Sequence, residues 1–295
     1  MRKAIIITVS LVVIISVGLC FSKHRKKRSD IASNTSATQT NDMTDLEQKV
    51  LSFTIDGRSP KGVKQWQLCG TSAEIMESEI HLDELQAVAY GEDVTINLTS
   101  DKGVYRKDAG EVELIGNVRV VSDDGLILTT DKAKWSQGTK EISTDTVVNI
   151  RKDGMIAIGT GGMANSEDKK ARLDKDVTVI MEPNTKVESS GSLNVDYGEN
   201  TAVFMDNVKV EDKDGHLFAD KLTVNFSPET QKITEVIAEG NVKVKKGNSY
   251  TLSDKAIYTE STKSAKLLGR PRVIIDSGEL SELNDLTETA PEEKK

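Results

Sequence analysis

Alternation of apolar and polar residues is the clearest pattern along this chain. Over residues 234–244, one set of alternate positions is small and apolar, including Val236 and Val242, and the other set is mostly charged. A period of two residues is typical of a β-strand with one buried and one solvated face. The pattern recurs over most of residues 53–276, which predicts an all-β body, although apolar residues in 73–88 could also fit a helix.

A Val-x-Val or Val-x-Ile triplet repeats at steps of 24 to 34 residues. Such a period is typical of a repeated supersecondary unit. Gly116 and Gly240 each stand two residues before a triplet, and a glycine inside a strand usually marks a bulge or a bend. The triplets begin at Val94, Val118, Val148, Val177, Val208 and Val242, and a degenerate copy begins at Pro271.

A second element follows each triplet after a turn, and in four copies it carries an Asp-Lys pair. The pairs begin at Asp101, Asp131, Asp220 and Asp254. Their repetition at one point of each unit indicates a structural role at a strand start rather than catalytic carboxylates. Turn sequences such as Asp-Asp-Gly at 123–125 separate the elements. Each unit is therefore interpreted as about three short strands.

The strands are expected to form an elongated open β-jellyroll of repeated short antiparallel strands. Two sheets packed face to face would enclose an apolar trough, and about ten strands in each sheet give a body roughly 50 Å long with open edges at both ends. A row of inward valines is also what a simple core requires. The residues predicted to line the trough and to bind a ligand are Val112, Leu114, Val118, Val120, Ile142, Val148, Ile150, Val177, Val179, Phe204, Val208, Val210, Val236, Val242 and Val244.

An apolar segment near the N-terminus predicts a membrane anchor. Residues 4–21 are uncharged and mainly apolar, and they lie between Arg2-Lys3 and a basic run at 23–28. At about 1.5 Å per residue, such a helix just crosses a hydrocarbon core of about 30 Å. A cleaved signal peptide is the alternative, but no small-x-small cleavage site follows the segment. The excess of basic residues after the segment would by itself keep the body in the cytoplasm.

Composition limits the possible functions. The net charge is −8 and no basic stripe lies outside 23–28, which argues against a nucleic acid partner. Cys20 and Cys69 offer neither a disulfide within the body nor a metal-ligand spacing. The three histidines form no Ser/His/Asp arrangement, and no phosphate-binding glycine loop is present. No catalytic residue, metal or cofactor is expected, and the chain is not predicted to be an enzyme.

Several stretches resemble a known family. Residues 66–74, Trp-Gln-Leu-Cys-Gly-Thr-Ser-Ala-Glu, resemble the opening strand of the LptC family of lipopolysaccharide-export periplasmic proteins. Residues 99–106 and 112–120 continue the resemblance. Residues 142–148 lie where the family has a threonine-rich strand, with Thr146 at the position of its usual proline.

From about residue 187 onward the chain is more similar to the LptA/OstA domain. Asp-Asn-Val-Lys-Val at 206–210 and Ala-Glu-Gly-Asn-Val-Lys-Val at 238–244 carry this similarity. The expected organisation is a transmembrane anchor over 4–21, a polar tether over 22–52, an LptC-like jellyroll over 53–185, an LptA/OstA-like extension over 186–276 and an acidic disordered tail over 277–295.

The resemblance implies a function in lipopolysaccharide export. It implies an inner-membrane anchor with a cytoplasmic N-terminus and a periplasmic body, and we follow it over the charge count because a long translocated domain weakens the charge rule. Such a protein receives lipopolysaccharide from the membrane subunits of an ABC transporter. It passes the lipid, with acyl chains in the trough, to an LptA-like bridge protein at a strand edge.

Two other hypotheses remain open. A membrane-anchored β-scaffold that polymerises through its ends would have a permanently filled core. An envelope glycan-binding or glycan-cleaving domain would need clustered exposed aromatics or paired carboxylates, and aromatic residues make up only 4% of the chain.

Overall fold

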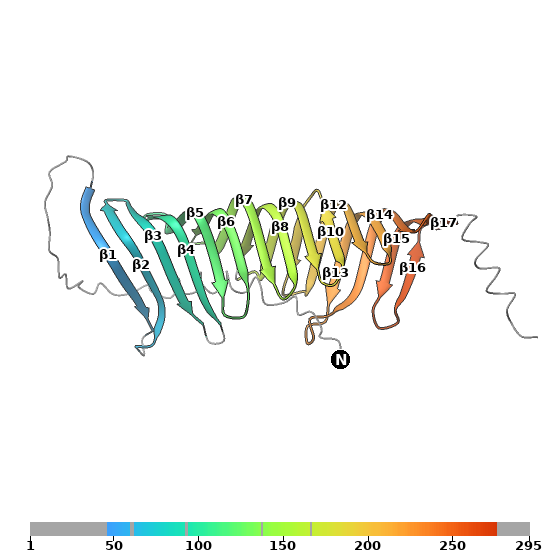
Figure 1. Ribbon diagram of the computed structural model, residues 1–295, viewed down its shortest axis with the longest axis horizontal. Helices are drawn as coiled ribbons and strands as arrows, with labels where there is room; N and C mark the ends of the chain where they lie inside the picture. The colour runs from blue at the N-terminus through green and yellow to red at the C-terminus, as the bar shows by residue number, and fades with distance from the viewer. Residues whose placement is uncertain (1–45, 60–61, 92–93, 137, 166, 276–295) are drawn as a thin grey trace, which may run out of the picture.

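A computed structural model describes residues 46–59, 62–91, 94–136, 138–165 and 167–275. These residues form one 17-stranded antiparallel sheet, which confirms the all-β prediction (Figure 1). No helix among them is long and apolar enough to cross a membrane. The predicted anchor and C-terminal tail lie outside the described residues.

Neighbours in sequence are neighbours in the sheet over most of its length. β10 and β11 share one position between β9 and β12, and β16 and β17 both pair with β15. The strands are β1 (Leu46–Arg58), β2 (Lys64–Met76), β3 (Glu79–Tyr90), β4 (Thr95–Arg106), β5 (Glu111–Ser122), β6 (Ile127–Ser136), β7 (Glu141–Lys152), β8 (Met155–Asn165), β9 (Lys170–Met181), β10 (Thr185–Ser189), β11 (Leu193–Asp196), β12 (Thr201–Asp212), β13 (Gly215–Phe226), β14 (Ile233–Lys246), β15 (Ser249–Thr259), β16 (Ser264–Leu268) and β17 (Arg272–Ile274).

Each repeat contains two long strands rather than about three short ones. β12 and β13, for example, have 12 residues each, and their pairing is interrupted only between Met205 and Val208. The sequence suggested extra strands because the alternation changes in the middle of a strand. The cause of that change is a β-bulge, which inserts a residue without ending the strand.

The Asp-Lys pairs lie at these bulges and not at strand starts, which corrects the earlier interpretation. In β13 the buried positions change from Ala219 to Leu222, and Asp220-Lys221 occupies the two positions between them. At the same level in the neighbouring strand β14, Gly240 and Asn241 both have positive φ (76° and 47°). The role is structural, as expected, but it belongs to the bend of the strand.

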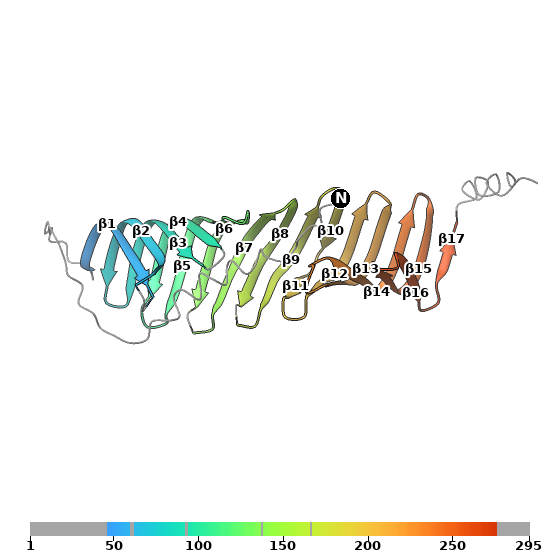
Figure 2. The ribbon, with the colours of Figure 1, turned by 90° about the horizontal axis from the view of Figure 1, so that it is seen from below.

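The bulges allow the single sheet to cover its own apolar face. Both halves of the strands contribute buried side chains to one core cluster, such as Leu114 and Val120 in β5. One sheet buries the same face on both halves of its strands only if the two halves fold toward each other, which gives two layers joined along the line of bulges. Figures 1 and 2 show the resulting elongated body, with β1 at one end and β17 at the other.

This architecture differs from the two separate sheets expected from sequence. The 17 strands occupy 15 successive positions, because two positions are each shared by a pair of strands. At about 4.8 Å per position the body is about 70 Å long rather than roughly 50 Å. The expected length was too small because it assumed that the strands are divided between two sheets.

Two local predictions are also corrected. Residues 73–88, where a helix could fit, belong to β2 and β3, and Glu77 and Ser78 lie between the two strands. The tether predicted over 22–52 ends earlier, because β1 already begins at Leu46. Charged residues at the start of β1 obscure the alternation that would have indicated a strand. Pairing of residues 46–58 with β2 nonetheless stabilises the strand.

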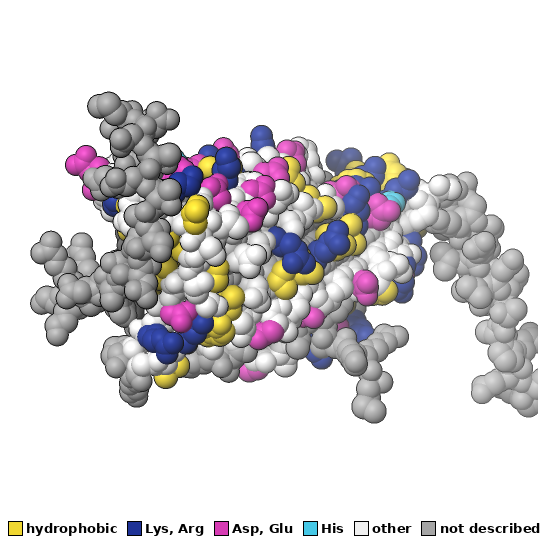
Figure 3. Space-filling model, turned by 60° about the vertical axis from the view of Figure 1, so that its left-hand side comes forward, with side chains coloured by type: hydrophobic (Ala, Val, Ile, Leu, Met, Phe, Trp, Pro, Cys, Tyr) yellow, Lys and Arg dark blue, Asp and Glu magenta, His cyan; other side chains and the backbone are white. Residues whose placement is uncertain are grey.

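The outer surface carries charges of both signs among scattered hydrophobic side chains (Figure 3). Some of these charges pair across strands: Glu239 lies 3.4 Å from the Lys221 ammonium and 2.8 Å from that of Lys255. Exposed pairs of this kind contribute at most about 1 kcal/mol each. Their main consequence is a solvated outer face opposite the apolar inner one.

Candidate functional site

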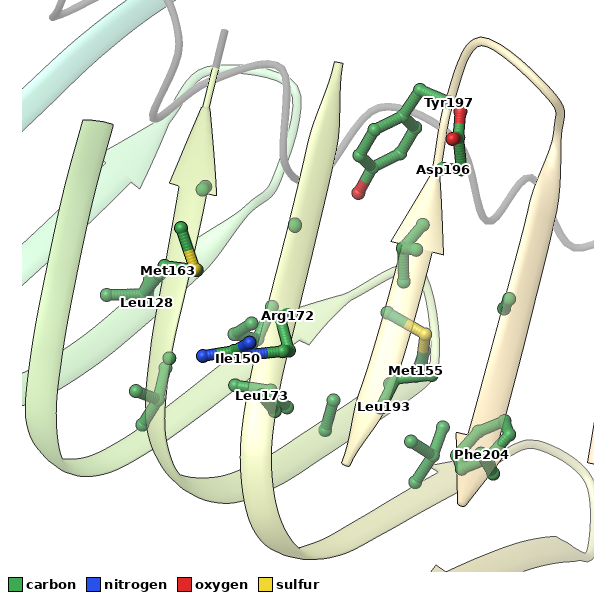
Figure 4. A pocket seen from close by; sticks show the side chains of 18 of the residues that line it. Leu128, Ile150, Met155, Met163, Arg172, Leu173, Leu193, Asp196, Tyr197 and Phe204 are labelled. Carbon is green, nitrogen blue, oxygen red and sulfur yellow. The ribbon is translucent and has the colours of Figure 1, made fainter. Parts of the chain in front are cut away.

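An elongated apolar cavity lies between the two layers in the middle of the sheet. Its volume is about 200 Å³, which exceeds the ~150 Å³ of an engineered apolar cavity that stays dry and admits benzene. Its lining extends from Leu128 in β6 to Ile233 in β14, and most of the side chains are apolar (Figure 4). The cavity can therefore hold a hydrocarbon chain.

Small inward residues create the space. In the neighbouring strands β4 and β5, Leu98 and Leu114 fill the interior, and Leu126 beside them is completely buried. Where the cavity lies, six of the 31 lining residues are alanine or glycine, and their small side chains leave space between the two layers. These small lining residues are Ala133, Ala157, Gly162, Ala164, Ala171 and Ala202.

Five residues of the predicted trough line this cavity. They come from β7, β9 and β12, whose alternation places them on the inner face of the folded sheet. The five are Ile142, Val148, Ile150, Val179 and Phe204.

The ten others lie outside the cavity lining. Val118, Val177, Val208 and Val242 directly follow the bulges, and each is only 1–2% exposed. Their environment is a packed core along the bend. Val244, in contrast, is 36% exposed. The remaining five belong to the core or pack against it, namely Val112, Leu114, Val120, Val210 and Val236.

Sequence reasoning missed several lining residues. Met155, Leu173, Met181, Val187 and Leu193 all face the cavity (Figure 4 labels three of them). Leu173 lies on the apolar face of the alternation in β9, but it is not among the predicted trough residues. The others precede or follow turns and interruptions, where the register of the alternation changes. The signal that could have found them is the turn sequence beside each one, such as Asp153-Gly154 directly before Met155.

The rim of the cavity at one edge of the sheet is polar. Tyr197 and Asn200 come from the β11–β12 turn, and Gln231 comes from the β13–β14 turn. Alternate hairpin turns lie at the same edge of an antiparallel sheet, and the Phe226 N–H donates to the Asn200 carbonyl at 2.9 Å, which ties the two turns together. Burial raises the pKa of the Tyr197 phenol well above its ordinary value, so it remains a neutral O–H group.

Asp196 provides a charge beside this rim. The Glu199 backbone N–H donates to its carboxylate at 2.9 Å, and the Lys170 ammonium lies 3.6 Å away. The hydrogen bond from Glu199 and the nearby charge of Lys170 hold the pKa of Asp196 below its ordinary value. The carboxylate is therefore ionised and already engaged by the protein.

A buried ion pair lies at the end of β7, on the inner face of the sheet. Lys152 follows Ile150 on that face and is only 6% exposed, but its ammonium pairs with Asp124, to which the Ser122 hydroxyl also donates. Burial alone would raise the pKa of Asp124, but the hydrogen bonds from Lys152 and Ser122 outweigh it and lower the pKa. The buried positive charge is thereby compensated.

The described residues contain no group of three or more His, Cys, Asp or Glu that could hold a metal ion. Cys69 is half-buried and free. The chemistry that the arrangement itself supports is burial of an apolar chain beside a hydrogen-bonding rim.

Two family models together match most of the chain. A model described as lipopolysaccharide-assembly, LptC-related, matches residues 10–182. A model described as LptA/(LptD N-terminal domain) LPS transport protein matches residues 186–284. The boundary between the two matches lies between β9 and β10. These two strands pair with each other, so the sheet is continuous across the boundary, and the cavity is lined by residues from both sides of it.

Solved structures that resemble the chain include LptH from Pseudomonas aeruginosa, described as the LptA homologous periplasmic component of the conserved lipopolysaccharide transport device. The sequence identity is 12% and the TM-score is 0.35, and the match covers 41% of this chain and 94% of that chain. No curated protein matches the chain.

Proposed function

The chain belongs to the LptC-related lipopolysaccharide-assembly family, and from this premise we propose that it carries lipopolysaccharide across the periplasm with the acyl chains in the cavity between its two layers. In this proposal residues 4–21 anchor it in the inner membrane, and the N-terminus is cytoplasmic. It receives the lipid from the membrane subunits of an ABC transporter. It is a transport component and not an enzyme.

The apolar cavity is the observation that carries the proposal. Moving a hydrocarbon chain from water into such a space is favourable by about 0.8 kcal/mol for each buried CH₂ group. The cavity is open to residues from both family matches, so a chain lying in it would contact the LptC-like and the LptA-like parts together. Burial alone supplies the binding energy, and no catalytic group is needed.

The two ends of the sheet support docking to other proteins. Leu51 in β1 is 70% exposed, Ile55 is 49% exposed, and Val273 in β17 is 63% exposed. Edge strands with free backbone groups pair readily with a strand of another chain. We propose that one edge meets the transporter and the other an LptA-like bridge protein.

The same exposed edges favour a second candidate function. Copies of this chain that joined end to end would form a membrane-anchored scaffold. A scaffold needs no ligand in the cavity, so the two functions differ in what contacts Val187 and Leu193.

Photo-crosslinking in cells tests the proposal. A photo-reactive residue would replace Val187 or Leu193, which face the cavity, and matched controls would replace Glu188 or Asn194, the next residue along each strand. We expect lipopolysaccharide adducts at the two cavity positions and none at the controls. Crosslinks only between copies of the chain, with no lipid adduct at any position, would instead support the scaffold.

A further inference from the structure

The outer face of the last strands combines basic and apolar side chains. Cross-strand partners point to the same side of a sheet, and Lys243 in β14 lies opposite Phe218 in β13 and Leu252 in β15. Because the next residue along, Val242, is buried in the core, alternation places Lys243 and its two partners on the outer face. Phe218 and Leu252 are partly exposed and do not belong to the core cluster.

The adjacent row of the same face has a similar character. Lys245 lies opposite Tyr250, and in β17 Arg272 lies opposite Leu252. The Lys243 ammonium is 4.7 Å from the centroid of the Tyr250 ring. Figure 3 shows Lys and Arg side chains among hydrophobic ones toward the C-terminal end of the body. We call this surface the C-terminal patch, formed by Phe218, Lys243, Lys245, Tyr250, Leu252 and Arg272.

The positive charges of the patch have no acidic partners in the sheet. Among the described residues, no carboxylate forms an ion pair with Lys243, Lys245 or Arg272, whereas Lys209 in the neighbouring β12 lies 2.9 Å from Glu211. The chain as a whole has a net charge of −8. Clustered charges of one sign attract a segment of the opposite sign. The patch therefore fits a partner that is acidic and also carries apolar side chains.

The sequence directly after β17 has this composition. Residues 279–287 read Glu-Leu-Ser-Glu-Leu-Asn-Asp-Leu-Thr, in which an acid followed by a leucine occurs three times at a spacing of three residues. The acids complement the cations of the patch, and the leucines complement its aromatic and aliphatic side chains. Neither the cavity nor the sheet edges account for this repeat.

The repeat is close enough to reach the whole patch. β17 pairs with β15, and Ile274 in β17 lies opposite Tyr250. From β17 to β13 is three strand positions, or about 14 Å, and the five steps of chain from Ile274 to Glu279 span up to about 17 Å. A tether this short gives an effective concentration on the order of millimolar. Weak contacts then suffice for docking within one chain.

We propose that residues 279–288 dock on the C-terminal patch of the same chain, with their carboxylates on Lys243, Lys245 and Arg272 and their leucines on Phe218, Tyr250 and Leu252. The segment covers a surface that otherwise attracts polyanions, and another acidic partner reaches the patch only when the segment leaves it. This inference does not depend on lipid transport.

Zero-length crosslinking tests the proposal. A carbodiimide joins a carboxylate to a lysine amine that it contacts, and mass spectrometry identifies the joined peptides. The sample is full-length protein in detergent, an equal mixture of unlabelled and nitrogen-15-labelled chains. We expect crosslinks from residues 279–288 to Lys243 and Lys245, without mixed pairs of labelled and unlabelled peptides. Lys102 in β4, which is exposed and forms no ion pair with the described residues, is the control lysine.

Two triple variants test the leucines while leaving every acid in place. Replacing the three leucines by serine should reduce the crosslink yield at Lys243 and Lys245 by about tenfold or more, because even partial burial of three leucines contributes that factor to the binding constant. Alanine at the third position of each repeat should leave the yield unchanged. The substitutions are Leu280→Ser, Leu283→Ser and Leu286→Ser, against Ser281→Ala, Asn284→Ala and Thr287→Ala.

Three results would overturn the proposal. Mixed pairs would show that the segment docks on a second copy of the chain. Absence of crosslinks at the patch, or equal yields at Lys243 and Lys102, would leave the patch open to another polyanion. Equal yields from the two triple variants would mean that only charge attracts the segment. None of these results bears on acyl-chain binding in the cavity.

Discussion

At the residue scale, the fold depends on a recurring contact between an aspartate and the bulge of the next strand. The Asn117 side-chain amide donates to the Asp101 carboxylate at 2.8 Å, and Asn241 donates to Asp220 at the same distance. A glycine precedes each asparagine because the aspartate lies directly above it. These contacts repeat along the line where the two layers join, so they fix the direction in which the sheet bends.

Replacing the glycine tests this account. A Cβ on Gly240 would lie 2.3 Å from Asp220 Oδ2, and the residue has φ = +76°. Gly240→Ala should therefore destabilise the protein by about 2 kcal/mol, from backbone strain together with the clash. Gly138→Ala is the control, because nothing lies within 4 Å of its Cβ position. Equal shifts of the denaturation midpoint for the two variants would show that the bulge does not need glycine.

The buried pair of Lys152 and Asp124 gives a second prediction at this scale. Asp124→Ala would leave the Lys152 ammonium buried without its carboxylate and should destabilise the protein by about 3 kcal/mol. The double variant Asp124→Leu with Lys152→Met should recover most of this loss, because no charge then remains to be compensated. Chemical denaturation of the three proteins measures the difference. A double variant no more stable than Asp124→Ala would mean that the charges themselves hold these turns.

At the element scale, strands of about 12 residues are bent at their middle, and the residue after the bend is the most tightly packed. Val118, Val177, Val208 and Val242 occupy this position in four strands. They form the seam between the layers, and none of the four lines the cavity. The valine triplet that reveals the repeat is thus primarily a packing feature.

Truncating a seam valine should have a larger effect than truncating its partner in the triplet. Val242→Ala removes two buried methyl groups and should destabilise the protein by about 2 kcal/mol. Val244→Ala, at a position 36% exposed, should stay within about 0.5 kcal/mol of the wild type. Urea denaturation midpoints distinguish the two. A larger loss at Val244 would place the packed seam on the other side of the triplet.

The strands and the repeat could be predicted from alternation, because most inward residues are apolar and most outward residues are polar. The path of the strand through its bend could not, because a bulge and a turn both interrupt alternation with polar or glycine residues, as Asp220-Lys221 and Gly240 do. Phe204 and Val179 were found as lining residues because they lie in regular stretches. Gln231 and Tyr197 were missed because they lie in turns, where alternation carries no information.

At the scale of the whole molecule, one continuous sheet joins the LptC-like and LptA-like parts. β9, in the LptC-like part, pairs with β10 and β11, in the LptA-like part. β10 and β11 pair in turn with β12. The cavity spans this junction, so the step from one module to the next needs no docking of two separate chains. In our account an acyl chain lies across the junction, between the two layers.

Lipid bound to the full-length protein, measured by native mass spectrometry after purification from cells, tests this central claim most directly. Ala157→Leu combined with Ala202→Leu fills the cavity, and the exposed Ala265→Leu is the control. Extra methylene groups in a packed interior typically destabilise by about 1–3 kcal/mol, so thermal unfolding must show that the double variant is folded. The account predicts an acyl-bearing amphiphile on the wild type and on the control and its loss from the filled variant. The same lipid occupancy in a folded, filled variant would contradict it.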